Sequence, residues 1–428
     1  VLGFIDRSSY TTLTAHPGRR LENNYSLNTV DICPVGALTS SDFRFKMRVW
    51  FLKETKSFCT SCATGCNTII GSRENVIFRQ TPRENDAVNS CWMCDYGRLN
   101  FDYLQGDLRL LEPLVRENNL LQPATWSHAI ASAAAQLKPF GGEQIAILAS
   151  GRMTNEELWL TKKLADSLGV TLIDILPREG EGDDILLSAD RNPNTNGARL
   201  ILGERPHPNP LPPGEGDSFA TAEHAADELH REARAEVREE NSLSPGEKVR
   251  MRANSAGPVL PQIKEAILSG QVRALISLGE NPLRIGIGDE FLERLPVYIV
   301  MDLLSNETTG FASVVLPSLG FAEKRGSMIN GKGRLQRLNR AVRGPGQARD
   351  DSEILRDLLQ ALTGGNGIFT IEDVFREMRE AIPEFAGLTL SRIGDLGTEI
   401  LETERSPSPP GEPAREKVRK REREKHPQ

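Results

Sequence analysis

The chain has 428 residues, of which 38% are hydrophobic, and its formal net charge is −7. This length predicts about two or three domains with real cores, and the acidic balance gives no reason to expect nucleic-acid binding. No run of about 18 apolar residues occurs, so we predict no membrane-spanning helix, and any membrane association would come through partners.

The first predicted segment, residues 1–50, is the C-terminal remnant of a ferredoxin-like cluster domain. It begins at Val1, within sequence typical of a domain interior, and contains Cys33 followed by Pro34. A Cys-Pro pair is a common form of the last ligand of a ferredoxin-type cluster. Proline fixes the turn after the sulfur, and Gly36 allows close backbone approach. One cysteine cannot hold a cluster, so Cys33 is either the last ligand of an incomplete second [4Fe-4S] site or an inert remnant.

Four cysteines mark the second predicted domain, residues 51–107. They are Cys59, Cys62, Cys66 and Cys94, in the pattern C-x2-C-x3-C-x27-C. Three close cysteines and a remote fourth are a recurrent way to hold an iron–sulfur cluster. Two β-branched runs within residues 67–78, separated by a Gly-Ser pair, predict a hairpin that returns Cys94 to the other three. These thiols are the candidate ligands, and hence the metal site, of one complete [4Fe-4S] cluster.

Zinc is the main alternative for these cysteines. The pairs Cys59-x2-Cys62 and Cys91-x2-Cys94 resemble the knuckles of structural zinc sites, although Cys66 would then have no role. A disulfide framework belongs to short secreted chains and is not expected here. Cys91 is not needed for a four-ligand site, and we expect it to be a small buried residue beside the cluster.

Residues 108–204 and 257–400 are predicted to form one doubly wound α/β domain. The nearly continuous apolar run at 144–149 suits a buried parallel strand. Thr154 and Glu157 form a capping box that opens the next helix. Alternating strands and helices of this kind are typical of a doubly wound sheet. Further predicted elements are strands at 170–173, 273–278, 296–301 and 312–316 and a helix at 260–268.

Two loops of this domain could carry ligands but are interpreted as structural. The loop at 279–282 follows a predicted strand, where α/β sheets bind ligands, yet it lacks a glycine-rich phosphate fingerprint. The loop at 331–334 contains two glycines and an arginine, and a simple turn is again the expectation.

Two polar segments interrupt the α/β pattern. Residues 205–256 form a Pro-rich and charged insertion, and residues 401–428 form a basic tail with a similar Ser-Pro-rich pattern. Neither can bury enough apolar surface to fold, so we predict that both are disordered. The basic end of the tail is expected to be a solvated charge run.

Several motifs together resemble one known family. They are residues 33–39, residues 43–50, the four-cysteine set, and residues 155–157, 180–184, 190–194 and 326–336. They resemble the large iron–sulfur subunit, known as the G subunit, of bacterial respiratory complex I (NADH:quinone oxidoreductase), over roughly residues 1–204 and 257–360. The resemblance implies a small 4Fe-4S domain followed by an α/β domain that is similar to molybdopterin oxidoreductases and kept without the molybdenum cofactor. It also implies that Cys33 is the last ligand of a second [4Fe-4S] cluster.

The function that the resemblance implies is electron transfer. The chain would be an electron-carrying and structural subunit, passing electrons from NADH and flavin toward quinone, with no catalytic residue and no NADH or quinone site of its own. Its partners would be the other peripheral-arm subunits, including the flavin/NADH-binding subunit and the quinone-module subunits. Its location would be cytoplasmic, on the inner face of the bacterial plasma membrane through the complex.

Two other functions remain open. A catalytic molybdopterin oxidoreductase would pass electrons from the same kind of cluster to molybdenum. Against it, no cysteine follows Cys94, and Tyr96 stands where such enzymes usually place lysine in C-x-K-G-R. The third function is a zinc-binding scaffold without redox activity.

Overall fold

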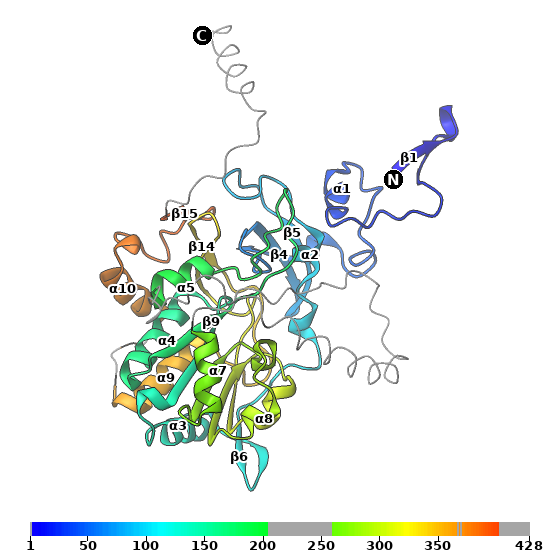
Figure 1. The fold of residues 1–428 in the computed structure, drawn as a ribbon. Coiled ribbons are helices and arrows are strands. Elements are labelled where there is room, and N and C mark those ends of the chain that lie inside the picture. The colour runs from blue at the N-terminus through cyan, green and yellow to red at the C-terminus, as the bar shows by residue number, and fades with distance from the viewer. Residues whose placement is uncertain (1, 204–258, 366–367, 369, 402–428) are drawn as a thin grey trace, which may run out of the picture.

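The computed structural model describes residues 2–203, 259–365, 368 and 370–401 (Figure 1). The two segments predicted to be disordered, 205–256 and 401–428, lie outside these residues except for Leu401. Within the described residues, no helix is long and apolar enough to cross a bilayer.

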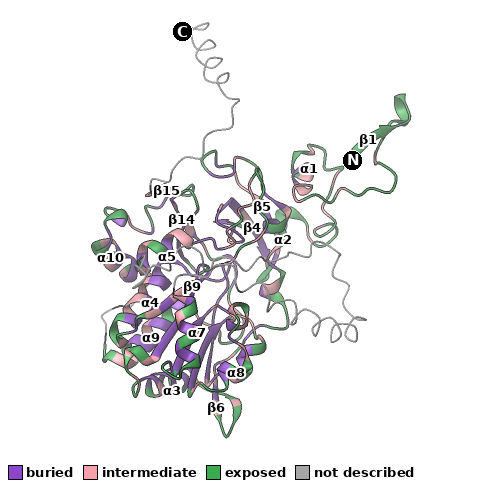
Figure 2. Cartoon of the chain, viewed as in Figure 1, coloured by how far each residue is buried: buried purple, intermediate pink, exposed green. Residues whose placement is uncertain are grey.

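Residues 2–50 form an arm that projects from the rest of the molecule (Figure 1). Strand β1 (Leu2–Ile5) pairs antiparallel with β2 (Thr12–Ala15), and helix α1 spans Leu27–Ile32. Most of the arm is exposed (Figure 2). The tip of the arm is therefore held by few contacts, whereas α1 packs against the domain that follows.

The cysteine domain (residues 51–107) is built on a three-stranded antiparallel sheet in the order β3-β4-β5. Its elements are β3 (Lys53–Phe58), β4 (Asn67–Arg73), β5 (Val76–Pro82) and helix α2 (Asp95–Leu99). The predicted hairpin is confirmed, but its turn is not the Gly-Ser pair. The turn residues are Glu74 and Asn75, with φ of 50° and 68°, which suits a tight two-residue hairpin turn. The pair Gly71 and Ser72 instead marks a shift in the β4–β5 register.

A seven-stranded mixed sheet forms the centre of the α/β domain. Its order is β7-β6-β12-β11-β10-β8-β9. The strands β12, β11, β10, β8 and β9 are parallel, and the β6–β7 hairpin adds antiparallel strands at one edge. The strands are β6 (Leu114–Glu117), β7 (Leu120–Pro123), β8 (Ile145–Ser150), β9 (Leu172–Leu176), β10 (Ala274–Leu278), β11 (Val297–Asp302) and β12 (Val314–Pro317).

Helices cover both faces of this sheet, because its central strands are apolar on both sides. One core joins alternate strand residues such as Ile147 and Ile276 to one group of helices. The other core joins Leu148 and Leu275 to helices of the opposite face. The first group is α3 (Trp126–Leu137), α4 (Asn155–Leu168), α5 (Thr195–Leu202), α9 (Asp351–Thr363) and α10 (Ile371–Ala381); the second is α7 (Leu260–Leu268) and α8 (Asp289–Leu292). This arrangement confirms the predicted α/β fold class.

The predicted start of α4 is also confirmed. The Thr154 hydroxyl accepts a hydrogen bond from the Glu157 N–H at 3.3 Å, and the Glu157 carboxylate accepts one from the Thr154 N–H at 2.8 Å. Gly169, with φ of 68°, ends the helix.

Another small sheet lies between the cysteine domain and the α/β core. It has the order β13-β14-β15, and β14 also contacts β3. The strands are β13 (Gly326–Ile329), β14 (Arg334–Leu338) and β15 (Thr398–Glu399). Short 3-10 turns complete the fold at Ser8–Tyr10, Val49–Phe51, Asp102–Gln105, Gly142–Gln144, Pro282–Ile285, Glu307–Phe311 and Pro383–Phe385.

Candidate metal centre

Three of the candidate thiols lie on one loop between two paired strands. Cys59 directly follows β3, and Cys66 directly precedes β4. The Cys59 N–H donates to the Cys66 carbonyl at 2.8 Å, which closes the loop. All four predicted ligands are buried; Cys59, Cys62, Cys66 and Cys94 are 4%, 4%, 3% and 4% exposed.

The fourth thiol reaches this loop from the start of α2. Cys94 is the N-cap residue, and its Sγ accepts a hydrogen bond from the Gly97 N–H at 3.3 Å. A Cβ atom built on Gly97 would lie 2.8 Å from the Cys59 Sγ and 3.4 Å from the Cys94 Sγ. Two sulfurs from distant parts of the sequence therefore face the same glycine, and only a residue without a side chain fits between them.

Burial and repulsion from neighbouring thiols favour the neutral form of Cys59, Cys66 and Cys94. Desolvation, and then the neighbouring thiols Cys62 and Cys94, raise the pKa of Cys59 to about 12. Burial also raises the pKa of Cys94 to about 11, although the Gly97 N–H acts in the opposite direction. The pKa of Cys66 is raised for the same reasons as that of Cys59. Four thiolates would be stable here only with a compensating positive charge, such as bound metal ions supply.

The thiols are surrounded by apolar side chains and by one arginine. Met93 packs against Cys59 and Cys66 and is 0% exposed, and Leu186 packs on the same cluster. The charge of Arg191 lowers the pKa of Cys94. Within the described part of the chain, the buried Nη1 of Arg191 has no hydrogen-bond partner. This unpaired donor beside the sulfurs is consistent with an acceptor on a bound group.

The donor set contains thiols only, which suits both an iron–sulfur cluster and a zinc site with four cysteine ligands. Tetrahedral zinc needs sulfurs about 3.8 Å apart, given Zn–S bonds of about 2.3 Å. Among the described residues, no group of three or more His, Cys, Asp and Glu side chains is placed to hold a single metal ion.

Cys33 lies apart from these four, at the C-terminal end of α1. The backbone N–H groups of residues 35–38, led by that of Leu38, lower the pKa of its thiol. Gly36, with φ of 64°, allows the backbone to curl around the sulfur, as the sequence predicted. Of the six cysteines in the chain, only Cys33 and Cys91 are outside the four-thiol set, so this chain supplies too few thiols for a second site of the same kind.

The expectation that Cys91 is buried is wrong, because its side chain is exposed. Amide side chains occupy the inner positions of its loop instead. Asn89 accepts from the Asn67 N–H at 2.9 Å and donates to the Trp92 carbonyl at 2.9 Å. Asn85 donates to the Asn67 side chain at 2.8 Å. These bonds fix the loop with Cys91 facing solvent.

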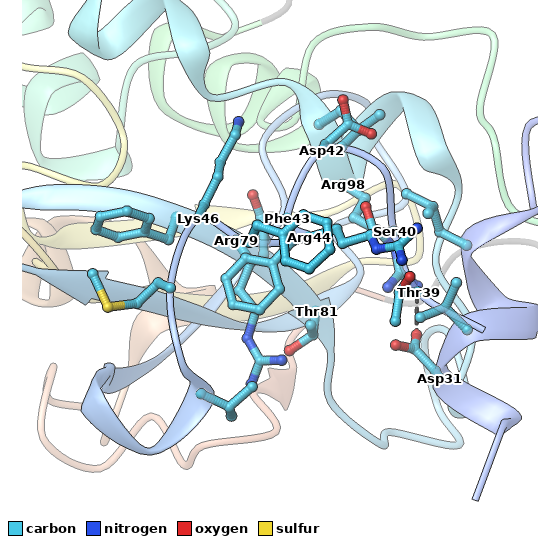
Figure 3. A pocket seen from close by; sticks show the side chains of 18 of the residues that line it. Asp31, Thr39, Ser40, Asp42, Phe43, Arg44, Lys46, Arg79, Thr81 and Arg98 are labelled. Atoms are coloured by element: carbon cyan, nitrogen blue, oxygen red, sulfur yellow. Dashed lines mark hydrogen bonds and ion pairs between the residues drawn. The ribbon is translucent and has the colours of Figure 1, made fainter. Parts of the chain in front are cut away.

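A cavity of about 610 Å³ separates the arm from the cysteine domain (Figure 3). Residues 38–47 of the arm form one wall, and residues of β5 and α2 form the other. Arg79 lies over the Phe43 ring at 5.3 Å, and Arg98 pairs with Asp31 at 2.7 Å. This ion pair connects α1 to α2, whose N-cap residue is Cys94.

Three family models match consecutive parts of the chain. The ferredoxin-like domain of NADH-quinone oxidoreductase subunit 3 matches residues 1–39. The NADH-ubiquinone oxidoreductase NDSU1/NuoG-like 4Fe-4S domain matches residues 52–102. The molybdopterin oxidoreductase model matches residues 109–184 and 232–361.

Similar solved structures share the fold of the chain. Acetylene hydratase from Pelobacter acetylenicus aligns with 79% of this chain and 72% of its own, with a TM-score of 0.50 and 10% sequence identity. At this identity the likeness concerns the fold alone.

Curated relatives match the chain over a shorter stretch. The G subunit of NADH-quinone oxidoreductase from Rickettsia felis is 36% identical over 168 residues, which is 39% of this chain and 25% of that protein. The corresponding protein of Streptomyces coelicolor is 36% identical over 166 residues, which is 39% of this chain and 20% of that protein. The match thus spans a quarter or less of each relative. The order of the three domain types, together with this identity, shows that the chain belongs to the family of the large iron–sulfur subunit, the G subunit, of NADH-quinone oxidoreductase.

Proposed function

We propose that the chain holds one [4Fe-4S] cluster on Cys59, Cys62, Cys66 and Cys94 and carries electrons within NADH:quinone oxidoreductase. The observation that carries the proposal is that all four thiols are buried, that the Cys59 and Cys94 sulfurs face the same glycine, Gly97, and that the neighbouring thiols act on Cys59 and Cys66 electrostatically. A bound cluster would supply reversible one-electron transfer. No acid, base or nucleophile of the chain is needed for that chemistry.

The residues around the thiols have defined roles in this proposal. Met93 and Leu186 exclude water, which raises the cost of every change of charge in the site. The Gly97 N–H donates to a ligand sulfur, and Arg191 adds positive charge. Both groups stabilise negative charge on the sulfurs and so favour the reduced state.

The proposed context is the peripheral arm of the enzyme. The partners would be the flavin/NADH-binding subunit and the quinone-module subunits, on the cytoplasmic, inner face of the bacterial plasma membrane. Cys33 would be the last ligand of a second cluster whose other ligands are not in this chain. The proposed domains are residues 1–50, residues 51–107, and residues 108–204 with 257–400.

Low-temperature EPR of the anaerobically reduced chain, with iron, zinc and molybdenum quantitation, tests the proposal. We expect about four irons per chain and one cluster signal. The signal should disappear in Cys94→Ser and survive in Cys91→Ser, which is a matched control because Cys91 is exposed. Stoichiometric zinc without iron would replace the proposal by a zinc scaffold. Stoichiometric molybdenum would replace it by a catalytic molybdopterin oxidoreductase.

A further inference from the structure

A second cavity, of about 300 Å³, lies at the carboxyl ends of the parallel strands. Its lining includes residues that directly follow β8, β10, β11 and β12. The cysteine domain closes it from the other side with Thr60, next to Cys59, and Tyr96, which follows Cys94 by two residues. The cavity therefore lies between the sheet and the four-thiol site, and it is independent of the cavity in Figure 3.

Two arginines flank the point where the chain reverses its direction across the sheet. From β8 the chain passes through α4 to β9 on one side, whereas β10 pairs with β8 on the other. Parallel α/β sheets bind ligands in the crevice at such a point. Arg152 follows β8 and Arg284 follows β10, and both line the cavity. The loop at 279–282, interpreted from sequence as a simple turn, forms part of the same wall.

These two guanidinium groups are not directly paired, although the charge of Glu280 acts on both from a distance. Among the described residues, neither has a side-chain hydrogen bond or an ion pair, and both remain exposed. The other cations nearby are already paired. Arg178 forms two bonds to Glu280, at 2.6 and 3.2 Å. Lys324 lies 2.7 Å from Glu157 and 2.6 Å from Asp351.

The electrostatics around Arg152 favour an anion. Desolvation by the surrounding protein, and then repulsion from Arg178, lower the pKa of Arg152. Desolvation and Arg178 also lower the pKa of Arg284. Two carboxyls of the wall oppose an anion, those of Asp302 and Asp351. Burial raises the pKa of Asp302 to about 6, and backbone N–H groups of residues 303 and 304 bind it. Asp351 is paired with Lys324 at 2.6 Å.

We propose that this cavity binds a phosphate group, as inorganic phosphate or a small phosphate ester, between the guanidinium groups of Arg152 and Arg284. Arginine presents a planar set of donors that matches phosphate oxygens, and two arginines match the charge of a dianion. The volume is at the lower end of small-molecule cavities, about 300–1,000 Å³, so the organic part of an ester must be small. None of the four candidate cluster ligands lines this cavity, so the proposal does not depend on bound iron.

Isothermal titration calorimetry of the full chain tests the proposal with inorganic phosphate and with glycerol 3-phosphate, at constant ionic strength set by sodium chloride. We expect saturable binding of at least one probe. Tighter binding of glycerol 3-phosphate identifies an ester as the ligand, and equal or tighter binding of phosphate identifies the inorganic ion. Arg152→Gln and Arg284→Gln should each weaken binding by about tenfold or more.

The matched control is Arg199→Gln, an exposed arginine on α5 that does not line the cavity, and its affinity should equal that of the parent. Circular dichroism and the Tm without phosphate verify that each variant is folded. Arg152→Lys and Arg284→Lys keep the positive charge and should bind the probe with intermediate affinity. They replace the Gln variants as the test if a Gln variant does not fold. No saturation at millimolar probe, or equal affinity in all variants, would overturn the proposal.

Discussion

Gly97 is the residue whose backbone and lack of side chain both serve the four-thiol site. Its N–H donates to the Cys94 sulfur, and a Cβ there would lie 2.8 Å from the Cys59 sulfur. We expect Gly97→Ala to displace one of these sulfurs and to lower the iron content per chain at least severalfold. Iron quantitation after anaerobic purification measures this.

Gly106→Ala is the control for that substitution, because it lies in the same domain and its added Cβ would meet only ordinary contacts at 3.7 and 4.0 Å. Its iron content should equal that of the parent. Equal iron in Gly97→Ala and Gly106→Ala would contradict the assigned role of Gly97. The sequence displays Gly97 next to Cys94, but its contact with Cys59 depends on how two loops meet, which spacing alone does not reveal.

At the scale of one element, the first turn of α4 is unusual because its polar residues Asn155, Glu156 and Glu157 are all 0% exposed. Each is held by a partner from another element. The Glu156 carboxylate accepts from the Ser327 N–H at 2.9 Å and from the Ser327 hydroxyl at 2.8 Å. Asn155 donates to the same hydroxyl at 3.0 Å. These bonds fix β13 against α4.

Burial raises the pKa of Glu156 from 4.5 to about 7. Between these two values the folded state binds more protons than the unfolded state, so the free energy of unfolding falls as pH rises. Glu156→Gln keeps acceptor and donor groups but cannot ionise. Above about pH 7 the variant should be more stable than the parent by up to about 3 kcal/mol, and near pH 4.5 the two should be equal. Urea unfolding across this range measures the difference, and a variant less stable at about pH 8 would contradict the argument.

Lys324 is the cation that neutralises the junction of α4 and α9, between Glu157 and Asp351. The two carboxylates raise its pKa above the ordinary value. Lys324→Met should lower the free energy of unfolding by about 3–5 kcal/mol, because it leaves buried carboxylates without a partner. Lys162→Met is the control, since Lys162 forms only a surface pair with Asp166 at 3.8 Å. It should change stability by less than about 1 kcal/mol, and an equal loss in both variants would contradict the role of Lys324.

Elements set by local signals could be predicted from the sequence, and elements set by distant contacts could not. The capping box at Thr154 and the apolar run of β8 are local, and both were predicted at nearly the right residues. Strand β3 has a mixed polar sequence, and it is a strand because it pairs with β4, so it was missed. Cys91 was placed inside because cysteine is usually buried, whereas distant amide bonds of Asn89 determine its exposure.

At the scale of the whole molecule, hydrogen bonds attach the cysteine loop to the α/β domain. The Ala63 N–H donates to the Asp190 carbonyl at 2.9 Å, and the Ala63 carbonyl accepts from the Gly331 N–H at 2.6 Å. The Gln336 side chain donates to the Gly65 carbonyl at 2.8 Å. The motifs at 190–194 and 326–336, far from the cysteines in sequence, thus surround the candidate site. The loop at 331–334 forms a turn within this contact.

Because the same loop holds the thiols and contacts the α/β core, metal binding and folding of the whole chain should be coupled. Metal binds the folded site more tightly than the unfolded chain, so removing iron should lower the free energy of unfolding by several kcal/mol. Calorimetry before and after chelation should show one transition that moves to lower temperature. Gln336→Ala, which removes the bond to Gly65, should reduce this shift, because the metal site would then be less firmly attached to the core. The contrary outcome is that chelation removes a small separate transition and leaves the main transition at its original temperature, in the parent and in Gln336→Ala alike. The two domains would then fold independently, and the hydrogen bonds between them would not couple metal binding to the stability of the core.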